Sequence, residues 1–426
     1  MKKKISTRNF IFISIILVIA MVFTIFKMPV AFSDYIFNGF ARSFNFGLDF
    51  ADNVSATFTV DSADYYKGTD ETLTRDAQNL VQDLVLDVYK DGKVEIVGED
   101  KVKITVPGDT ISNRVVVGQL EMKAESGEEA ETFINGSHVK QVSYMMNGTN
   151  HGVYIEFNKD GKEKFENLTS TAASGGKTIY VYLNKNYEGG RQISGIEEAM
   201  TDGVCYISLG SKEDAKTYAD QLNNSKYGIN LSIDNNAQVN SSNANTFQKV
   251  MCVVVSCLTL VGLSLFFILK FKEMGWVMSL ALFIYAVLNI ITLSLIPSFV
   301  LSFGSLVALM FGVLLVGFTM YLLVEKSQKE FYNGKKLPIS FKAGYKKSIM
   351  PVVDIYAVTL IVSILLLILA KGTAFCVGFG MLFGSLFGVG TTLLLLRGFM
   401  IMYLHINPSK GNKINFAKGE NVDEIQ

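Results

Sequence analysis

Residues 346–372 read KKSIMPVVDIYAVTLIVSILLLILAKG, in which one carboxylate, Asp354, is followed by sixteen uncharged residues. A run of roughly 20 mostly apolar residues predicts a helix that crosses a membrane. A charged side chain at the centre of a bilayer costs about 3 kcal/mol even on insertion scales. Asp354 is therefore either an interfacial residue near a helix start, where the dipole favours negative charge and Lys346 and Lys347 are close, or a functional intramembrane site.

Further apolar runs crowd into the first 30 positions and the stretch from about 248 to 404 of the 426-residue chain. We predict six spans, at residues 10–26, 250–269, 276–296, 299–324, 349–370 and 375–396. The first run follows a basic start, as in a signal peptide. No small-residue cleavage site follows it, so we favour an uncleaved anchor.

Lysine and arginine predict the orientation of these spans. Basic residues gather in the N-terminal tail, in the turn after the second span, in the loop 325–348 and in the tail 405–426, whereas the opposite turns hold a single Lys371. Because Lys and Arg accumulate in cytoplasmic loops, we expect both termini in the cytoplasm. We expect a first segment at 1–30, a polar extracytoplasmic domain at 31–247 and five spans at 248–404.

Composition narrows the function classes. The chain carries 39 basic and 39 acidic residues, so it gives no reason to expect nucleic acid as a partner. The four cysteines have neither the pattern of a disulfide framework nor the spacing of a metal site. No cofactor motif occurs in the polar domain.

Residues 31–247 alternate strand-like and helix-like patterns, which predicts an α+β domain. We expect strands at 56–60, 93–97, 101–106 and 177–183, and helices at 70–89, 158–172 and 211–224. Leu80, Leu84 and Val88 should share one face of the first helix, and Asn158 and Ser211 should cap the other two. His138 and His151 are expected at the surface.

The layout and several motifs together resemble the SecD family, the accessory subunits of the bacterial Sec protein-export channel within the resistance-nodulation-division superfamily. FNFGLDFADN at 44–53 is similar to the family's Gly-Leu-Asp-Leu-x-Gly-Gly through Gly47 and Asp49, although the paired glycines are missing. Asp354 falls on the Asp of Asp-Ala-Asn-x-Thr-Thr. The next motif, Gly-x-Gly-x-x-x-Gly-Phe, is matched by Gly372, Gly378 and Phe379.

One departure concerns the fourth span, which in the family ends in Gly-Met-Ala-Val-Asp-Ala-Asn-Val-Leu-Ile-Phe-Glu-Arg. Here the same place reads LLVGFTMYLLVEK, and anchoring on Glu325 puts Phe318 at the Asp. The carboxylate that the family associates with proton coupling in this helix is absent. The resemblance then leaves Asp354 as the proton-coupling candidate.

Other residues have a structural interpretation beside a functional one. Glu325 with Lys326 is typical of a solvated pair at the cytoplasmic surface, whereas the family match implies a tie between the fourth span and the following loop. Asp49 is either an exposed turn residue or a hinge. Three glycines repeat every four residues, as in close helix contacts within a bundle or toward a partner, namely Gly380, Gly384 and Gly388.

The resemblance implies half of a resistance-nodulation-division bundle, with an extracytoplasmic α+β domain containing ferredoxin-like elements. It implies a multi-pass subunit of the bacterial cytoplasmic membrane that assists late stages of export with the proton gradient, without enzyme chemistry, cofactor or metal. Its implied partners are a six-span SecF-like subunit, the SecYEG channel, YajC, unfolded exported polypeptides and membrane lipids. Two alternatives stay open: a small-molecule or lipid transporter of the same superfamily, and a non-transporting adaptor or sensor.

Overall fold

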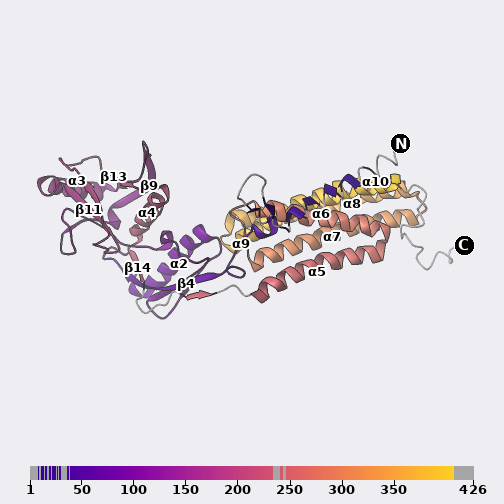
Figure 1. The fold of residues 1–426 in the computed structure, drawn as a ribbon, viewed down its shortest axis with the longest axis horizontal. Coiled ribbons are helices and arrows are strands. Elements are labelled where there is room, and N and C mark those ends of the chain that lie inside the picture. Colours follow the sequence, from indigo (N-terminus) through magenta and orange to yellow (C-terminus); the bar gives the residue numbers. More distant parts are fainter. Residues whose placement is uncertain are drawn as a thin grey trace. The chain divides into compact units, whose positions relative to one another are not determined.

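The described part of the chain forms two compact units, shown in Figure 1. The helix unit consists of Met1–Ala51 and Ala244–Gln426, and the sheet unit consists of Asp52–Asn243. The computed structural model describes residues 8, 11–13, 15–16, 19–20, 22–24, 26, 28–29, 36–37, 39–233, 240–242 and 246–406.

One half of the sheet unit is an antiparallel sheet covered by a helix. The strand order is β14-β4-β6-β5, and β15 also pairs with β4. Helix α2 packs against this sheet through Ala77, Val81 and Val85, which are fully buried. The elements are β4 (Asn53–Ser62), α2 (Asp70–Tyr89), β5 (Lys93–Ile96), β6 (Lys101–Pro107), the 3-10 turn η2 (Asn113–Val115), β14 (Ile229–Ile233) and β15 (Asn240–Ser242).

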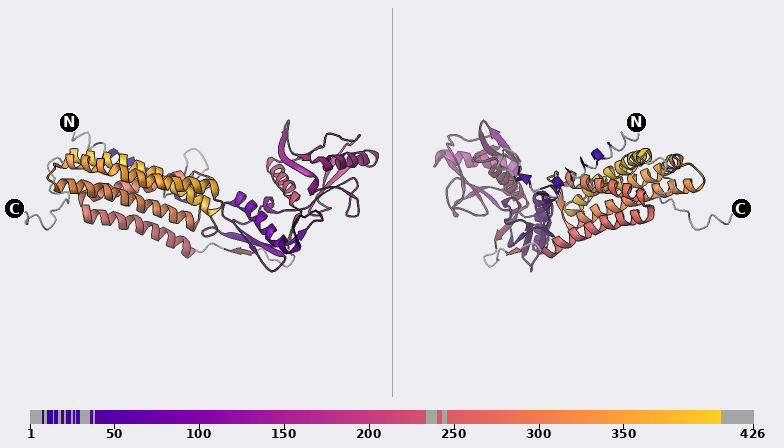
Figure 2. Two further views of the ribbon diagram at one scale, coloured as in Figure 1. Left: turned by 180° about the vertical axis from the view of Figure 1, so that it is seen from behind. Right: turned by 45° about the vertical axis from the view of Figure 1, so that its right-hand side comes forward.

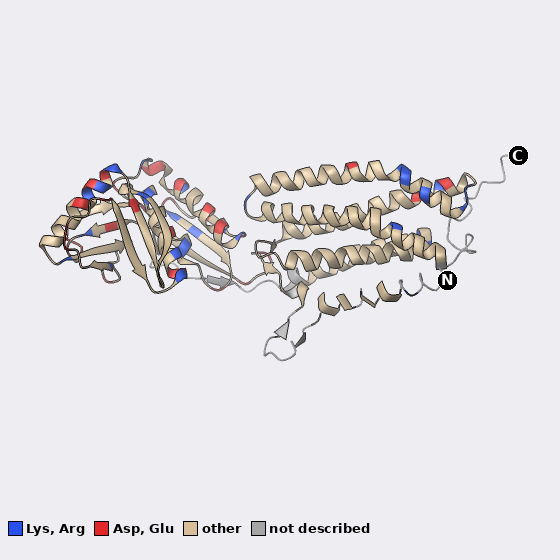
Figure 3. Ribbon diagram, turned by 90° about the horizontal axis from the view of Figure 1, so that it is seen from above, with Lys and Arg blue, Asp and Glu red and all other residues tan. Residues whose placement is uncertain are grey.

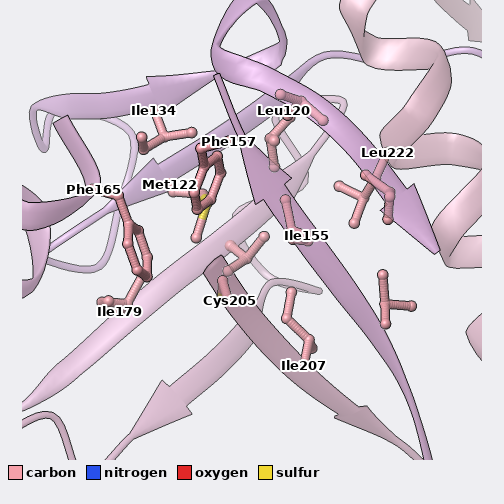
Figure 4. Close-up of a cluster of buried hydrophobic side chains, with 14 of the residues drawn as sticks. Leu120, Met122, Ile134, Ile155, Phe157, Phe165, Ile179, Cys205, Ile207 and Leu222 are labelled. Atoms are coloured by element: carbon pink, nitrogen blue, oxygen red, sulfur yellow. The ribbon is translucent and has the colours of Figure 1, made fainter. Parts of the chain in front are cut away.

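The other half contains two smaller antiparallel sheets, with strand orders β12-β11-β7-β8 and β13-β10-β9. Figure 4 shows Met122, Phe157 and Phe165 pointing toward one another in the core that these sheets share with two helices. The elements are β7 (Leu120–Lys123), β8 (Thr132–Asn135), η3 (Gly136–His138), β9 (Val139–Asn147), β10 (Asn150–Phe157), α3 (Lys159–Ser174), β11 (Thr178–Leu183), β12 (Arg191–Ser194), β13 (Val204–Leu209), α4 (Lys212–Asn224) and η4 (Ser225–Tyr227).

The predicted caps are confirmed. The Asn158 side chain accepts a hydrogen bond from the Gly161 amide at 2.9 Å, and the Ser211 hydroxyl accepts one from the Asp214 amide at 3.0 Å. Each satisfies an amide that the helix itself leaves without a partner. The four predicted strands fall within β4, β5, β6 and β11, apart from single residues at strand ends.

The α2 face predicted from the sequence packs at the margin of the contact with the sheet, and the predicted surface position of His138 is wrong. The face of α2 that turns to the sheet carries alanine and valine, and Leu80, Leu84 and Val88 only flank the contact, partly buried. A neighbouring stripe of the same period, one position round the helix, made the choice ambiguous. His138 is 8% exposed and not a surface residue. It lies in η3 beside the start of α3, and these two elements enclose its side chain.

Among the described residues of the helix unit, five helical stretches are long and apolar enough to cross a membrane. They run side by side in Figures 1 and 2. They are α5 (Thr246–Phe271), α6 (Glu273–Ser294), α7 (Phe303–Tyr332), α8 (Leu337–Leu369), and α9 (Thr373–Val389) continued by the π-helix η5 (Gly390–Leu395) and α10 (Leu396–Ile406). Much of the predicted first span, 10–26, lies outside the described residues.

Short elements complete the described helix unit. They are β1 (Met28–Pro29), β2 (Ile36–Phe37), the turn η1 (Phe40–Arg42), β3 (Asn45–Phe46) and β16 (Val300–Leu301). Strand β3 pairs in parallel with β16, so the segment 45–46 is joined to the chain just before α7.

The Lys-rich segment 325–348 is mostly helical and not the predicted loop. Helix α7 runs on to Tyr332 and α8 begins at Leu337, so only four residues separate them. Lysine and glutamate are good helix formers, and here they extend both apolar helices beyond their spanning parts. Figure 3 shows Lys and Arg gathered at this end of the bundle.

Proline interrupts the hydrogen bonds of α8, at Pro351. It has no N–H to donate to the carbonyl four residues earlier, which belongs to Lys347. The Lys326 ammonium of α7 donates to that carbonyl at 3.0 Å. A side chain from the neighbouring helix therefore replaces the missing backbone donor.

Candidate functional site

Asp354 lies on the exposed face of α8, within an apolar stripe. Its neighbours on that face are Met350 and Val358, one turn before and after, which are 69% and 62% exposed. A carboxylate in such a stripe is costly next to lipid. The side chain therefore lies on the outside of the described bundle and does not point into its interior.

The expected compensation by Lys347 is wrong, because that ammonium is bonded to the Glu330 carboxylate at 2.5 Å. Lys347 also lies about two helical turns before Asp354, which separates the two residues by about 10 Å along the axis of α8. Among the described residues, Asp354 has no hydrogen bond or ion pair.

The bundle interior holds a cluster of neutral hydroxyls, which we call the hydroxyl cluster: Thr319 of α7, Tyr356 of α8 and Thr392 of η5. The Thr319 hydroxyl lies 2.9 Å from that of Tyr356 and 3.0 Å from that of Thr392. All three residues are buried. The Thr319 hydroxyl donates to the Val316 carbonyl at 3.0 Å and can accept from both of the other hydroxyls, so the cluster is hydrogen-bonded within the bundle while carrying no charge.

Sequence reasoning missed this cluster, although a signal was present one residue away. Phe318, which aligns with the family's Asp, is 52% exposed, and its neighbour Thr319 is fully buried. The inward position at this level of α7 is therefore Thr319. The other carboxylates of residues 246–406 lie at the Lys-rich end of the helices, at Glu273, Glu325 and Glu330.

The glycine repeat of α9 packs inside the bundle, where its three members meet three different helices. A Cβ on Gly380 would lie 3.4 Å from Ala308 of α7, and one on Gly384 would lie 3.1 Å from the Tyr285 hydroxyl of α6. A Cβ on Gly388 would come within 2.5 Å of the Tyr356 ring of α8. The repeat thus sets the approach of α9 to its neighbours, including a residue of the hydroxyl cluster.

The Gly-Leu-Asp motif joins the segment before the sheet unit to the start of α7. The Asp49 carboxylate accepts a hydrogen bond from the Phe303 amide at 2.7 Å. The Gly47 amide donates to the Leu301 carbonyl at 3.0 Å, next to the β3–β16 pair. Asp49 therefore binds the amide-rich, positive end of α7 and is not a free turn residue.

The remaining motif residues lie around α9. Gly372 precedes the helix with φ +64°, a conformation that glycine adopts without strain. A Cβ on Gly378 would lie 3.1 Å from Leu366 and Leu367 of α8. Phe379 packs edge-to-face on Phe375, with ring centroids 5.0 Å apart. These residues shape the turn and packing between α8 and α9.

Glu325 forms a pair with Lys329 at 3.2 Å, one turn along α7, and the helix does not end there. The tie across the turn to α8 is made by Glu330, which sequence reasoning missed. Its carboxylate is almost fully buried and receives both Lys335 and Lys347. A carboxylate so placed needs both cations, because an unpaired buried charge is strongly destabilising.

The comparisons with known proteins agree with this architecture. The chain is 22% identical to the protein translocase subunit SecD of Dictyoglomus turgidum over 77% of this chain and 82% of that protein. It is 23% identical to SecD of Acidaminococcus fermentans, covering 73% and 75%, and 21% identical to SecD of Sebaldella termitidis, covering 89% and 94%. No family model matches the sequence.

Solved structures with a similar fold are those of SecDF. A crystal structure of SecDF in a super-membrane-facing form has a TM-score of 0.65 at 17% identity, and covers 95% of this chain. SecDF from Thermus thermophilus has a TM-score of 0.50 at 16% identity. The chain spans 58% and 59% of the length of those two structures.

Fold and comparisons together define a class: membrane proteins with several spanning helices and a large sheet-containing unit. Within that class the resemblance to SecD is confirmed, since the chain is similar over most of its length to SecD subunits and has the fold of SecDF.

Proposed function

We propose that this chain acts in protein export as an accessory subunit of the Sec translocase. The observation that carries the proposal is the similarity to SecD subunits along both units of the chain, together with a SecDF-like fold. The function needs binding and conformational change, and no covalent chemistry.

The proposal includes an orientation and a sixth span. The first span would be residues 10–26, with the Lys-rich end of the bundle and both termini in the cytoplasm and the sheet unit outside. The gathering of Lys and Arg at the α7–α8 end supports this orientation. Antiparallel sheets covered by α2, α3 and α4 are consistent with ferredoxin-like elements in the outer unit.

We place proton coupling, if this chain contributes to it, at Asp354. The hydroxyl cluster is neutral, and Asp354 is the carboxylate of residues 246–406 that lies away from the Lys-rich end. Its exposed position supports a site shared with a second membrane subunit, for which a six-span SecF-like protein is the proposed partner.

The sheet unit would hold the exported polypeptide. One exposed apolar feature that suits this role is the β9–β10 hairpin, where Met145 and Met146 are 42% and 60% exposed. Flexible methionine side chains adapt to varied apolar sequences. YajC and the SecYEG channel complete the proposed assembly.

Copurification separates the proposed function from the two alternatives. The tagged full-length chain, extracted from its native membrane in mild detergent, should recover the SecYEG channel and a SecF-like subunit. A chain recovered with neither would favour a superfamily transporter or an adaptor, and recovery with an unrelated receptor would favour the sensor.

The role of Asp354 is tested by Asp354→Asn in vesicles that export a reporter protein. We expect the proton-gradient-dependent part of the export rate to fall to the level seen without a gradient, because the amide cannot bind and release a proton. Asp354→Glu should keep most of that part. Val358→Asn, which places an amide on the same face one turn away, should keep it fully.

A response to the gradient that Asp354→Asn leaves untouched would contradict the coupling role while leaving the export function standing. A loss in Val358→Asn equal to that in Asp354→Asn would assign the effect to polarity of the face and not to titration.

A further inference from the structure

A cavity of about 850 Å³ opens between the end of α7, the start of α8 and α10. It lies at the Lys-rich end of the helix unit, and neither Asp354 nor a residue of the hydroxyl cluster lines it. Sites of about 300–1,000 Å³ are typical for small organic ligands. The cavity is therefore large enough for a lipid headgroup and the beginning of its chains.

One part of the wall is basic. Lys336, Lys342, Arg397 and His405 line the cavity, and no acidic residue does so among the described residues. The Arg397 guanidinium lies 4.5 Å from the centre of the Tyr345 ring, which also lines the cavity. The Tyr345 hydroxyl is itself fixed by donating to the Leu393 carbonyl of η5 at 2.9 Å. Arg397 is thus oriented by a rigid aromatic platform.

The other part of the wall is apolar, and includes Leu337, Phe341, Met400 and Ile401. Ile401 is 44% exposed on α10, so apolar wall continues onto the outer surface of the bundle. A site with cations at the level of the helix ends and apolar side chains beside them matches an anionic phospholipid in both chemistry and depth. Free phosphate would make no contact with the apolar wall, and a zwitterionic lipid would bring a cation of its own next to the basic residues.

We propose that this cavity binds an anionic phospholipid, with the phosphate held by Lys342 and Arg397 and the start of an acyl chain against Leu337 and Ile401. The leaflet follows from the proposed orientation and is the cytoplasmic one; the binding itself does not depend on the export function.

The test is native mass spectrometry of the purified full-length protein with phosphatidylglycerol or phosphatidylcholine. We expect the wild type to retain phosphatidylglycerol about tenfold better than phosphatidylcholine, because both lipids offer a phosphate but the choline cation is repelled by the basic wall. Lys342→Gln with Arg397→Gln should abolish the preference. Lys346→Gln removes the same charge one turn along α8, outside the cavity lining, and should preserve it.

A second variant distinguishes loss of the lipid site from misfolding of the double mutant. Ile401→Trp fills the apolar wall from an exposed position and keeps every cation, and it should also weaken retention of phosphatidylglycerol. Equal retention in the wild type and both cavity variants would overturn the proposal. If soluble glycerophosphoglycerol fully displaces phosphatidylglycerol, the cavity binds only the phosphate headgroup, and the role of the apolar wall is wrong. Lipid retention that appears only after removal of residues 407–426, whose last seven residues carry Glu420, Asp423 and Glu424, would assign the cavity to that tail and overturn the proposal.

Discussion

His138 is a titratable side chain enclosed in the fold of the sheet unit. Its Nδ1 accepts a hydrogen bond from the Asn135 amide at 3.0 Å, which requires that nitrogen to be unprotonated. Burial lowers the pKa of His138, and the nearby Lys164 lowers it further, while Asp160 partly offsets them. The folded state therefore favours the neutral imidazole.

This predicts a pH dependence for the stability of the sheet unit. The unfolded chain takes up the proton at about pH 6.5. Below that pH the unfolded state binds more protons than the native state, so the free energy of unfolding should fall until the lowered native pKa is reached. Above about pH 7 it should not change through this group. Urea unfolding of residues 52–243 at several pH values measures the effect, and His138→Gln should flatten the profile between pH 7 and 5.5.

The same fall in the wild type and in His138→Gln would show that other groups cause it. The burial of His138 was not predictable from its neighbours in sequence. The turn that encloses it is short, and the helix that covers it starts some twenty residues later along the chain, at Lys159. Asn158 and Ser211 were predictable, because capping depends on residues only three positions away.

At the scale of elements, α8 depends on α7 for one of its own hydrogen bonds. Pro351 leaves the Lys347 carbonyl without a backbone donor, and Lys326 supplies the missing donor. The sequence predicts both helices from their apolar runs. It does not predict this bond, since Lys326 and Lys347 are 21 positions apart and the α7–α8 turn must first bring them together.

A double-mutant cycle tests this dependence. Lys326→Met should lower the free energy of unfolding of the helix unit by about 0.5–1.5 kcal/mol, the usual worth of one hydrogen bond. In the Pro351→Ala background, where the backbone donor is restored, the same change should cost much less. Thermal unfolding in detergent gives the four values, with Lys346→Met as a control for loss of a surface lysine. Equal effects of Lys326→Met in both backgrounds would contradict the interpretation.

At the scale of the whole molecule, the two units have separate cores. The sheet unit contains two clusters of buried apolar residues, one around Val81 and Ile104 and one around Phe165 and Ile155, and both are made only of its own residues. The alternation of polar and apolar regions along the sequence was sufficient to predict such a division. It could not predict which helix faces are internal, since α8 is apolar nearly all round.

We therefore expect residues 52–243, expressed alone, to fold. Circular dichroism should show mixed helix and strand content and a cooperative thermal transition, because each apolar cluster is complete within the fragment. Val81→Ala and Phe165→Ala should each lower stability, by about 1 and 3–5 kcal/mol respectively. A fragment that is unfolded, or folds only with the helices present, would show that the sheet unit depends on the membrane part.

The outward position of Asp354 has a consequence for how conduction through such an assembly could be organised. A titratable group on the outside of a bundle cannot take part in a proton pathway that runs within a single subunit. In the proposed assembly, protons that bind to Asp354 would pass along the contact between two subunits. The isolated chain in a sealed liposome should then be electrically silent, and any current should appear only when its counterpart is inserted beside it.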